Sequence, residues 1–152
     1  MGLRRKGREI VLQTLYSLDF DHDATLDDSV LEKKAYQQIL NSILESNTIK
    51  ADSKICEFSE TLLVTIISNL ITIDDMIKTH LDHWTIDKLA VLDRNLLRLA
   101  IAEIIYQKTP PAIAIDEALE IAKKYCCEQT GKLINGVLDH IVKNISTEPS
   151  KQ

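Results

Sequence analysis

Residues 89–106 read L-A-V-L-D-R-N-L-L-R-L-A-I-A-E-I-I-Y and decide the fold class. After Asn95 almost no polar face remains, and a helix that is apolar nearly all round belongs in the middle of a helical domain. Its length and its Leu/Ala content favour a helix over a buried strand. Four charged residues make it too short to cross a bilayer: Asp93, Arg94, Arg98 and Glu103. We therefore predict the central helix of an all-α domain.

Length and composition agree with that prediction. A chain of 152 residues suits one domain with a real core. Four glycines and three prolines are too few for a turn-rich β protein. Leu, Ile, Ala, Lys and Glu dominate instead, and these residues favour helices.

Charge and cysteine content suggest a compartment and a partner. The net charge is −5, yet the first eight residues hold four cations and no acid. A basic arm on an acidic body predicts two surfaces with different partners, one of them polyanionic; the alternative is a solvated, frayed terminus. The three cysteines form no C-x-x-C motif, and no signal peptide or transmembrane segment is recognisable. We expect unpaired thiols and a cytoplasmic protein without membrane partners.

The first predicted helix covers residues 3–18. Helical spacing places Leu3, Ile10, Val11, Leu15 and Leu18 on one broad face, and it places Arg5, Glu9 and Tyr16 together on the other. An exposed aromatic beside arginines suits single-stranded RNA, because bases stack on the ring while the cations pair with phosphates. The alternative is a rim tyrosine whose ring packs on a neighbouring helix.

Three further segments complete the first half. Residues 19–28 read as a solvated acidic loop, since the glycine and the glutamate of a calcium loop are missing. A helix follows over residues 27–45. The long helical stretch of residues 53–82 is expected to bend near Asn69.

The second half contains two more helices. Thr109-Pro110-Pro111 is the sharpest break, and a proline suits the first turn of the helix that follows it. Thr130 is the expected N-cap of the last helix. Gly136 within that helix is expected to mark a close helix crossing, so that a leucine there would overpack the core. For Asp93, at the start of the central helix, we expect hydrogen bonds from free backbone N–H groups.

No motif recommends an enzyme. The chain has no Gly-rich phosphate loop, nucleophile elbow or His-Glu-x-x-His sequence, and no base pairs in sequence with the cysteines. His80 and His83 have a spacing that two metal ligands could use, but no third or fourth ligand lies nearby. We predict no metal, no cofactor and no catalytic residue.

Four segments in order resemble the NusB family of bacterial transcription antitermination factors. They are R-R-K-G-R-E-I-V-L-Q-T-L-Y, L-D-R-N-L-L-R-L-A-I-A-E-I-I-Y, P-P-A-I-A-I-D-E-A-L-E-I-A-K-K-Y and K-L-I-N-G-V-L-D. The resemblance is strong over residues 89–141 and weak over residues 19–82. It implies about six or seven helices in a compact domain of two packed helical bundles. The expected single domain covers residues 1–146, with halves at 1–82 and 83–146, and residues 147–152 form a disordered tail.

The resemblance also implies partners. It predicts binding of the boxA element of nascent RNA together with NusE, a small-subunit ribosomal protein. That assembly joins the RNA polymerase elongation complex with other Nus factors and promotes transcription of rRNA operons. The positions that match RNA-binding residues are Arg4, Arg5, Lys6, Arg8, Tyr16, Lys132 and Leu133. Those that match the protein-partner face are Asp87 and Asp93.

The chain departs from the family pattern at three places. Gly7 replaces the usual alanine, which weakens the first helical turn by roughly 1 kcal/mol. Residues 126–130 replace a segment that usually carries glycine and a Glu-Asp-Ser run, and Leu133 often has an aromatic counterpart. The alternative function is a helical protein-binding adaptor related to the accessory domain of rRNA cytosine methyltransferases. Such an adaptor would lack catalysis, because no cofactor-binding α/β unit is present.

Overall fold

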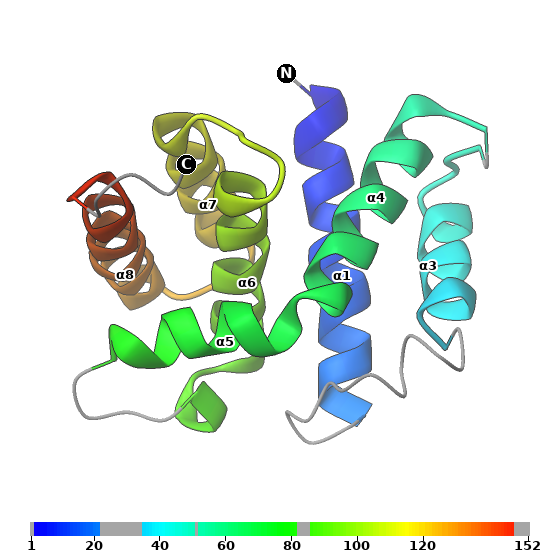
Figure 1. The fold of residues 1–152 in the computed structure, drawn as a ribbon. Helices are drawn as coiled ribbons and strands as arrows, with labels where there is room; N and C mark the ends of the chain where they lie inside the picture. Colours follow the sequence, from blue (N-terminus) through cyan, green and yellow to red (C-terminus); the bar gives the residue numbers. More distant parts are fainter. Residues whose placement is uncertain (1, 22–34, 51, 82–85, 148–152) are drawn as a thin grey trace.

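The computed structural model describes residues 2–21, 35–50, 52–81 and 86–147 (Figure 1). This part of the chain holds seven α-helices, one short 3-10 helix and no strand. With the labels of Figure 1, the elements are α1 Gly2–Asp21, α3 Ala35–Ser46, α4 Lys54–Ser68, α5 Leu70–Thr79, η1 Ile86–Lys88, α6 Val91–Ile105, α7 Pro111–Tyr125 and α8 Glu128–Thr147. The predicted all-α class is confirmed.

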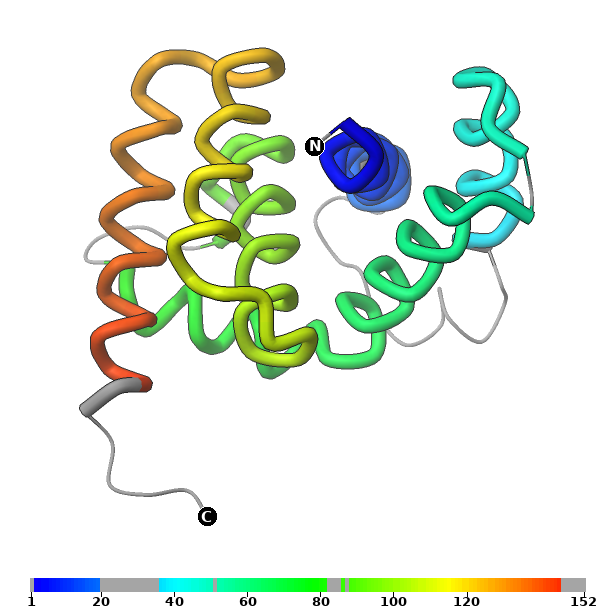
Figure 2. Tube along the Cα trace, turned by 90° about the horizontal axis from the view of Figure 1, so that it is seen from above, coloured from blue at the N-terminus to red at the C-terminus, as the bar shows by residue number. Residues whose placement is uncertain are grey.

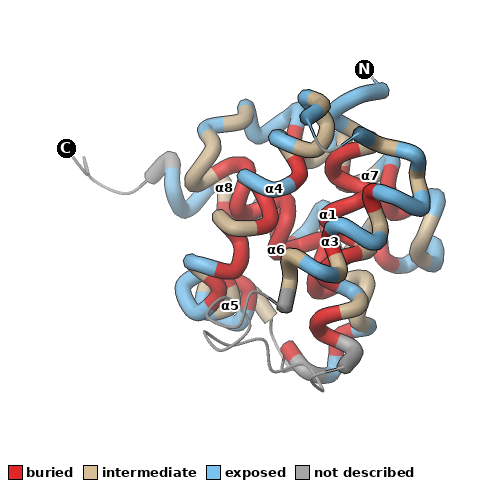
Figure 3. The backbone as a smooth tube through the Cα atoms, turned by 90° about the vertical axis from the view of Figure 1, so that its right-hand side faces the viewer, coloured by how far each residue is buried: buried red, intermediate tan, exposed pale blue. Residues whose placement is uncertain are grey.

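Helix α6 is the central helix, as predicted. It packs against α1, α4, α5, α7 and α8. The view from above shows α7 and α8 on one side of α6, with α1, α4 and α3 on the other (Figure 2). All residues from Arg94 to Ile104 are buried, including both arginines and Glu103. Buried segments gather along α6 and the facing sides of its neighbours (Figure 3). The missing polar face of α6 is thus explained by helices around it.

The bend in the long third stretch is also confirmed. Helices α4 and α5 are separated at Asn69, with 70° between them. The Asn69 side chain donates a hydrogen bond to the carbonyl of Thr65, 2.8 Å away, and its backbone N–H donates to Ile66. These bonds satisfy carbonyls at the end of α4, so the chain can change direction there. The bend lets α5 cross beside α6 instead of continuing along α4 (Figure 1).

Other boundaries differ from the predicted ones. Helix α1 continues three residues past Leu18, which places Asp19 inside a helix and buries it. The prediction of a solvated acidic loop is therefore wrong at Asp19, while residues 22–28 lie outside the described residues. Helix α7 begins at Pro111 as predicted. Helix α8 begins at Glu128, so Thr130 lies in its first turn and is not its N-cap.

Two of the helical glycines, Gly7 and Gly136, have opposite surroundings. A Cβ atom on Gly7 would lie 2.5 Å from Cδ2 of Phe58, whereas a Cβ atom on Gly136 would meet nothing within 4 Å. Gly136 is exposed, so the predicted close crossing at that position is wrong. The close approach is instead at Gly7, where α4 presses its Phe58 ring against α1.

The same substitution should therefore have opposite effects at these two sites. Gly136→Ala is expected to raise the free energy of unfolding by up to about 1 kcal/mol, because alanine is the better helix former. Gly7→Ala gains the same propensity but must displace the Phe58 ring, and overpacking of this kind costs about 1–3 kcal/mol. Urea unfolding of the two variants beside the wild type measures both changes. A stabilised Gly7→Ala variant would show that Phe58 can move away freely.

Candidate nucleic-acid interface

The four cations at the start of α1 have different surroundings. Arg4 is exposed, and its guanidinium carbon lies 5.6 Å from the centre of the Phe58 ring. Arg5 forms a two-pronged ion pair with Glu117 of α7, with both N–O distances 2.9 Å. Lys6 is half-buried and has no ion pair with any described residue. Of these four cations, only Arg4 and Lys6 form no ion pair with a described carboxylate.

Arg8 is a structural residue. Its side chain is 4% exposed, and it forms a two-pronged ion pair with Glu103 of α6 at 2.6 and 2.8 Å. Its third nitrogen lies 3.5 Å from Glu117. A phosphate would have to displace Glu103, which is itself buried and would then carry an unpaired charge. The predicted RNA contact at Arg8 does not fit this placement, and Arg8 instead connects α1 to α6.

The predicted exposed strip on α1 faces α7 along much of its length. Glu9 is 6% exposed and accepts hydrogen bonds from Lys124 and Tyr125, at 2.9 and 2.8 Å. Burial tends to raise the pKa of Glu9, but these two bonds, together with the charges of Lys124 and Lys6, outweigh it and hold the pKa below its usual range. The hydrogen bond from Arg5 likewise lowers the pKa of Glu117. Tyr16, further along this strip, stays 38% exposed.

The connection between α7 and α8 forms a second part of the predicted surface. Lys132 is exposed on α8, while Leu133 is half-buried and packs against the core. Thr130 is buried and donates a hydrogen bond to Asp93 of α6, 2.9 Å away. Asp93 therefore fixes the first turn of α8, and no side chain caps α6. The predicted capping of α6 by Asp93 is therefore wrong, because this carboxylate accepts its hydrogen bond from Thr130 of α8 instead.

The two adjacent cysteines of this connection differ. Burial, together with nearby Asp93, raises the pKa of the Cys126 thiol to about 12. Cys127 is exposed, and hydrogen bonding with Thr130 and with the first backbone N–H groups of α8 lowers the pKa of its thiol. Both thiols and that of Cys56 are free, as predicted.

Two grooves border the predicted binding residues. A groove of about 850 Å³ lies between Arg5, α7 and the first turn of α8, and four carboxylates line it: Asp116, Glu117, Glu120 and Glu128. A smaller groove of about 350 Å³ includes Lys88, Asp93 and Leu133. Asp87 lies in η1, and its side chain is outside the described residues. The smaller groove thus brings the predicted partner residue Asp93 next to the predicted RNA residue Leu133.

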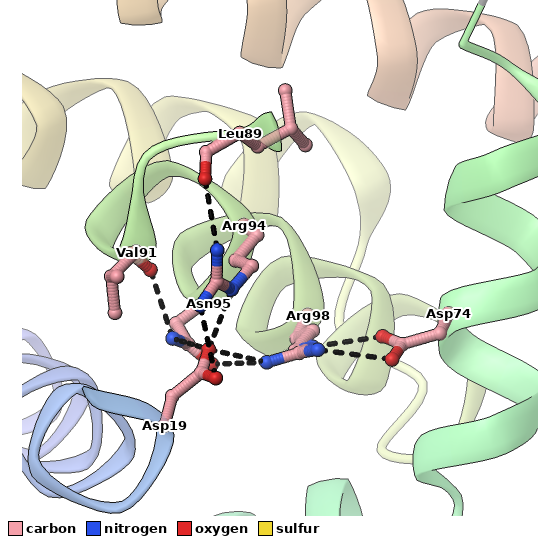
Figure 4. A network of polar contacts seen from close by, with 7 residues as sticks. All are labelled: Asp19, Asp74, Leu89, Val91, Arg94, Asn95 and Arg98. Atoms are coloured by element: carbon pink, nitrogen blue, oxygen red, sulfur yellow. Dashed lines mark hydrogen bonds and ion pairs between the residues drawn. The ribbon is translucent and has the colours of Figure 1, made fainter. Parts of the chain in front are cut away.

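A buried polar network joins three helices, α1, α5 and α6 (Figure 4). Asp19 of α1 accepts hydrogen bonds from Arg94 at 2.7 and 3.1 Å, from Asn95 at 2.8 Å and from Arg98 at 2.9 Å. The other side of Arg98 forms a two-pronged pair with Asp74 of α5, at 2.8 and 2.9 Å. Burial raises the pKa of Asp19, but the hydrogen bonds from Arg94 and Asn95 and the charge of Arg98 lower it further than burial raises it. No local sequence pattern predicts this network.

The histidines do not build a metal site in the described structure. Ring nitrogen Nδ1 of His80 lies 2.8 Å from the carbonyl of Met76, and the ring meets that of His140 edge-on with centres 5.2 Å apart. His83 lies outside the described residues. Within the described ranges, no three His, Cys, Asp or Glu side chains are grouped to hold a metal ion.

No single helix among the described segments has the length and apolar character needed to cross a bilayer. Helices α4 and α5 have that length and apolar character only when they are counted together, and a 70° bend separates them. The inner faces of both helices pack against the protein core.

Comparison with known proteins assigns the family. The NusB family model matches residues 5–143. The transcription antitermination protein NusB of Fervidobacterium nodosum is 38% identical over 92% of this chain and 90% of its own. The solved structure of T. maritima NusB aligns with a TM-score of 0.77 and 39% identity, covering 92% of this chain and 90% of that one. A solved complex of antitermination factors NusB and NusE with double-stranded RNA aligns with a TM-score of 0.78 and 30% identity, over 95% of this chain and 98% of that one. The chain therefore belongs to the NusB family.

Proposed function

We propose that this chain is an RNA-binding transcription antitermination factor that acts together with the ribosomal protein NusE. The main support is the match to the NusB family over residues 5–143, with a relative solved in a complex with NusE and RNA. The family resemblance assigns boxA of nascent RNA as the site and the RNA polymerase elongation complex, with other Nus factors, as the destination. The action would be cytoplasmic and would promote rRNA operon transcription by binding, without catalysis.

The RNA contacts that we propose follow from which cations are free. Arg4 and Lys6 form no ion pair with a described residue and would meet phosphates directly. Arg5 could contribute a phosphate contact by sharing its guanidinium with Glu117, since its side chain is 30% exposed. The Tyr16 ring would support a base, and Lys132 and Leu133 would extend the surface along α8. Arg8 would hold α1 in position.

The protein partner would bind beside η1 and the start of α6. The smaller groove there combines an apolar part, from Leu81, Leu89 and Leu133, with the Asp93 carboxylate. An acidic residue suits a basic ribosomal protein, and such charge pairs mainly affect association rate and specificity. Because Asp93 also accepts the hydrogen bond from Thr130, its replacement would disturb the α8 start as well as the interface. Asp87 is the cleaner test position for this proposal.

A salt titration tests the RNA contacts. For single strands, each phosphate contact contributes about 0.7 to the slope of log affinity against log salt. Arg4→Ala/Lys6→Ala should therefore lower the affinity for boxA RNA and flatten that slope by about 1.4. Tyr16→Ala should cost roughly 1–3 kcal/mol in binding and leave the slope nearly unchanged. Fluorescence anisotropy with NusE present measures both quantities.

Lys143→Ala is the matched control, because Lys143 is exposed on α8, about 16 Å along the helix from Lys132. It should bind like the wild type. If the affinity of the wild type and of all three variants depends on salt in the same way, the proposed RNA contacts are absent. The adaptor function would then be favoured if NusE still binds.

A further inference from the structure

A furrow runs along the side of Arg4 that faces α4 and the α6–α7 connection. It consists of two adjoining hollows of about 550 and 530 Å³, which share Leu3, Arg4, Gln107 and Thr109. Leu3 and Ile113 line it with side chains that are 61% and 51% exposed. Two large apolar residues thus remain in solvent next to the cation that we expect to bind RNA.

The furrow is basic although the chain as a whole is acidic. Lys54 at the start of α4 and Lys108 in the α6–α7 connection are exposed, and neither forms an ion pair with a described residue. Glu57 is its one exposed acid. The other carboxylate, Glu117, is occupied by Arg5 and Arg8. Together with Arg4, three free cations surround the furrow, so an anionic ligand is favoured there.

Phe58 fixes the position of Arg4 in this furrow. The guanidinium carbons of Arg4 and Arg8, one helical turn apart, both lie 5.6 Å from the centre of the Phe58 ring. Arg8 is anchored by Glu103, and the ring itself reaches α1 because Gly7 carries no side chain. An exposed arginine normally samples many rotamers, and contact with an aromatic face restricts them. Arg4 is therefore preorganised.

We propose that this furrow is a nucleotide-binding subsite for single-stranded RNA, with Phe58 as the positioning residue for Arg4. A base would stack on the Arg4 guanidinium between the exposed Leu3 and Ile113 side chains. The neighbouring phosphates would contact Lys54 and Lys108. This proposal rests on the proposed function and adds contacts from α4 and the α6–α7 connection to it. RNA is favoured over an acidic peptide because the furrow is lined by Arg4, which the proposed function already assigns to RNA.

The test measures the affinity of the full chain, with NusE present, for a boxA-containing single-stranded RNA. Lys54→Ala/Lys108→Ala should flatten the salt slope by about 1.4. Phe58→Leu should reduce affinity about tenfold, and Phe58→Tyr, which keeps the ring, should restore it. In an Arg4→Ala background Phe58→Leu should have no further effect, since Phe58 acts through Arg4. Melting temperatures confirm that each variant is folded, and Lys143→Ala again serves as control.

Three results would overturn the proposal. If Arg4→Ala/Lys6→Ala lowers RNA affinity but the Lys54, Lys108 and Phe58 variants do not, the furrow is no subsite and the proposed function stands. If the wild type binds no RNA, both fail together. If the furrow variants lose binding to a Glu-rich peptide with apolar residues and keep the wild-type RNA affinity, the furrow is a protein-docking groove.

Discussion

Replacing Asp19 with asparagine is expected to lower the free energy of unfolding by about 3–5 kcal/mol, the usual cost of removing one partner from a buried charge pair. The carboxylate is fully buried and accepts hydrogen bonds from Arg94, Asn95 and Arg98. Asparagine keeps the shape and loses the charge, so Arg94 is left buried without a carboxylate. Urea unfolding at pH 7 measures the change.

Asp139→Asn is the control for the same chemical change at an exposed site. Asp139 pairs with Lys143 on the surface of α8, with its side chain 58% exposed, and its replacement should change stability by less than about 0.5 kcal/mol. An Asp19→Asn variant as stable as Asp139→Asn would mean that water reaches the network in solution.

The pH dependence of stability provides a second measurement. Because the folded-state pKa of Asp19 is lowered, the unfolded state binds the proton more readily. The stabilisation by Asp19 is therefore complete above its unfolded-state pKa of about 4 and is lost as the pH falls through the folded-state pKa. Asp19→Asn should thus be most destabilised relative to wild type at neutral pH, with the difference shrinking in acid. A difference that stays constant down to pH 3 would contradict the lowered pKa.

The second large effect is expected at the pair of Arg8 and Glu103. Arg8→Met leaves Glu103 buried without its partner and should cost about 3–5 kcal/mol. Arg8→Met/Glu103→Met replaces both charges by apolar groups of similar size and should regain most of that loss. Denaturant unfolding of both single variants and the double variant gives the coupling energy. A single variant that costs under 1 kcal/mol would show that the pair is hydrated.

The folded double variant also separates the structural role of Arg8 from an RNA contact. If Arg8 only holds α1 in place, Arg8→Met/Glu103→Met should keep the wild-type salt slope for boxA RNA. If the slope is instead flattened by about 0.7, Arg8 contacts a phosphate in the wild-type complex.

Helix periodicity was sufficient to predict the architecture. The mostly apolar stretch that forms α6, the bend at Asn69 and the helix start at Pro111 all follow from local residue patterns. These features depend on neighbours within a few positions, which a single sequence shows directly. The resemblance of four segments then predicted the family.

Long-range polar contacts could not be predicted in the same way. Asp19 pairs with Arg94, 75 positions away, and Arg8 with Glu103, 95 positions away. A charged residue next to a loop normally faces water, so local patterns place Asp19 in solvent. The prediction that Arg8 contacts RNA comes from the family resemblance. The prediction at Gly136 is wrong and the contact at Gly7 was not predicted for a similar reason, because a close approach depends on what the other helix carries. Two arginines and a glutamate inside the apolar stretch of α6 were the signal for buried partners.

The two buried ion-pair clusters fix the register of α1 against α6. Arg8 meets Glu103 near one end of their contact, and Asp19 meets Arg94 and Arg98 near the other, so the two helices run antiparallel. Apolar side chains alone would tolerate a slip of one helical turn, about 5.4 Å, with a modest change in buried area. After such a slip neither cluster could form, and several charges would be buried without partners. The clusters therefore select one alignment of α1, and with it the place where Arg4 and Lys6 are presented.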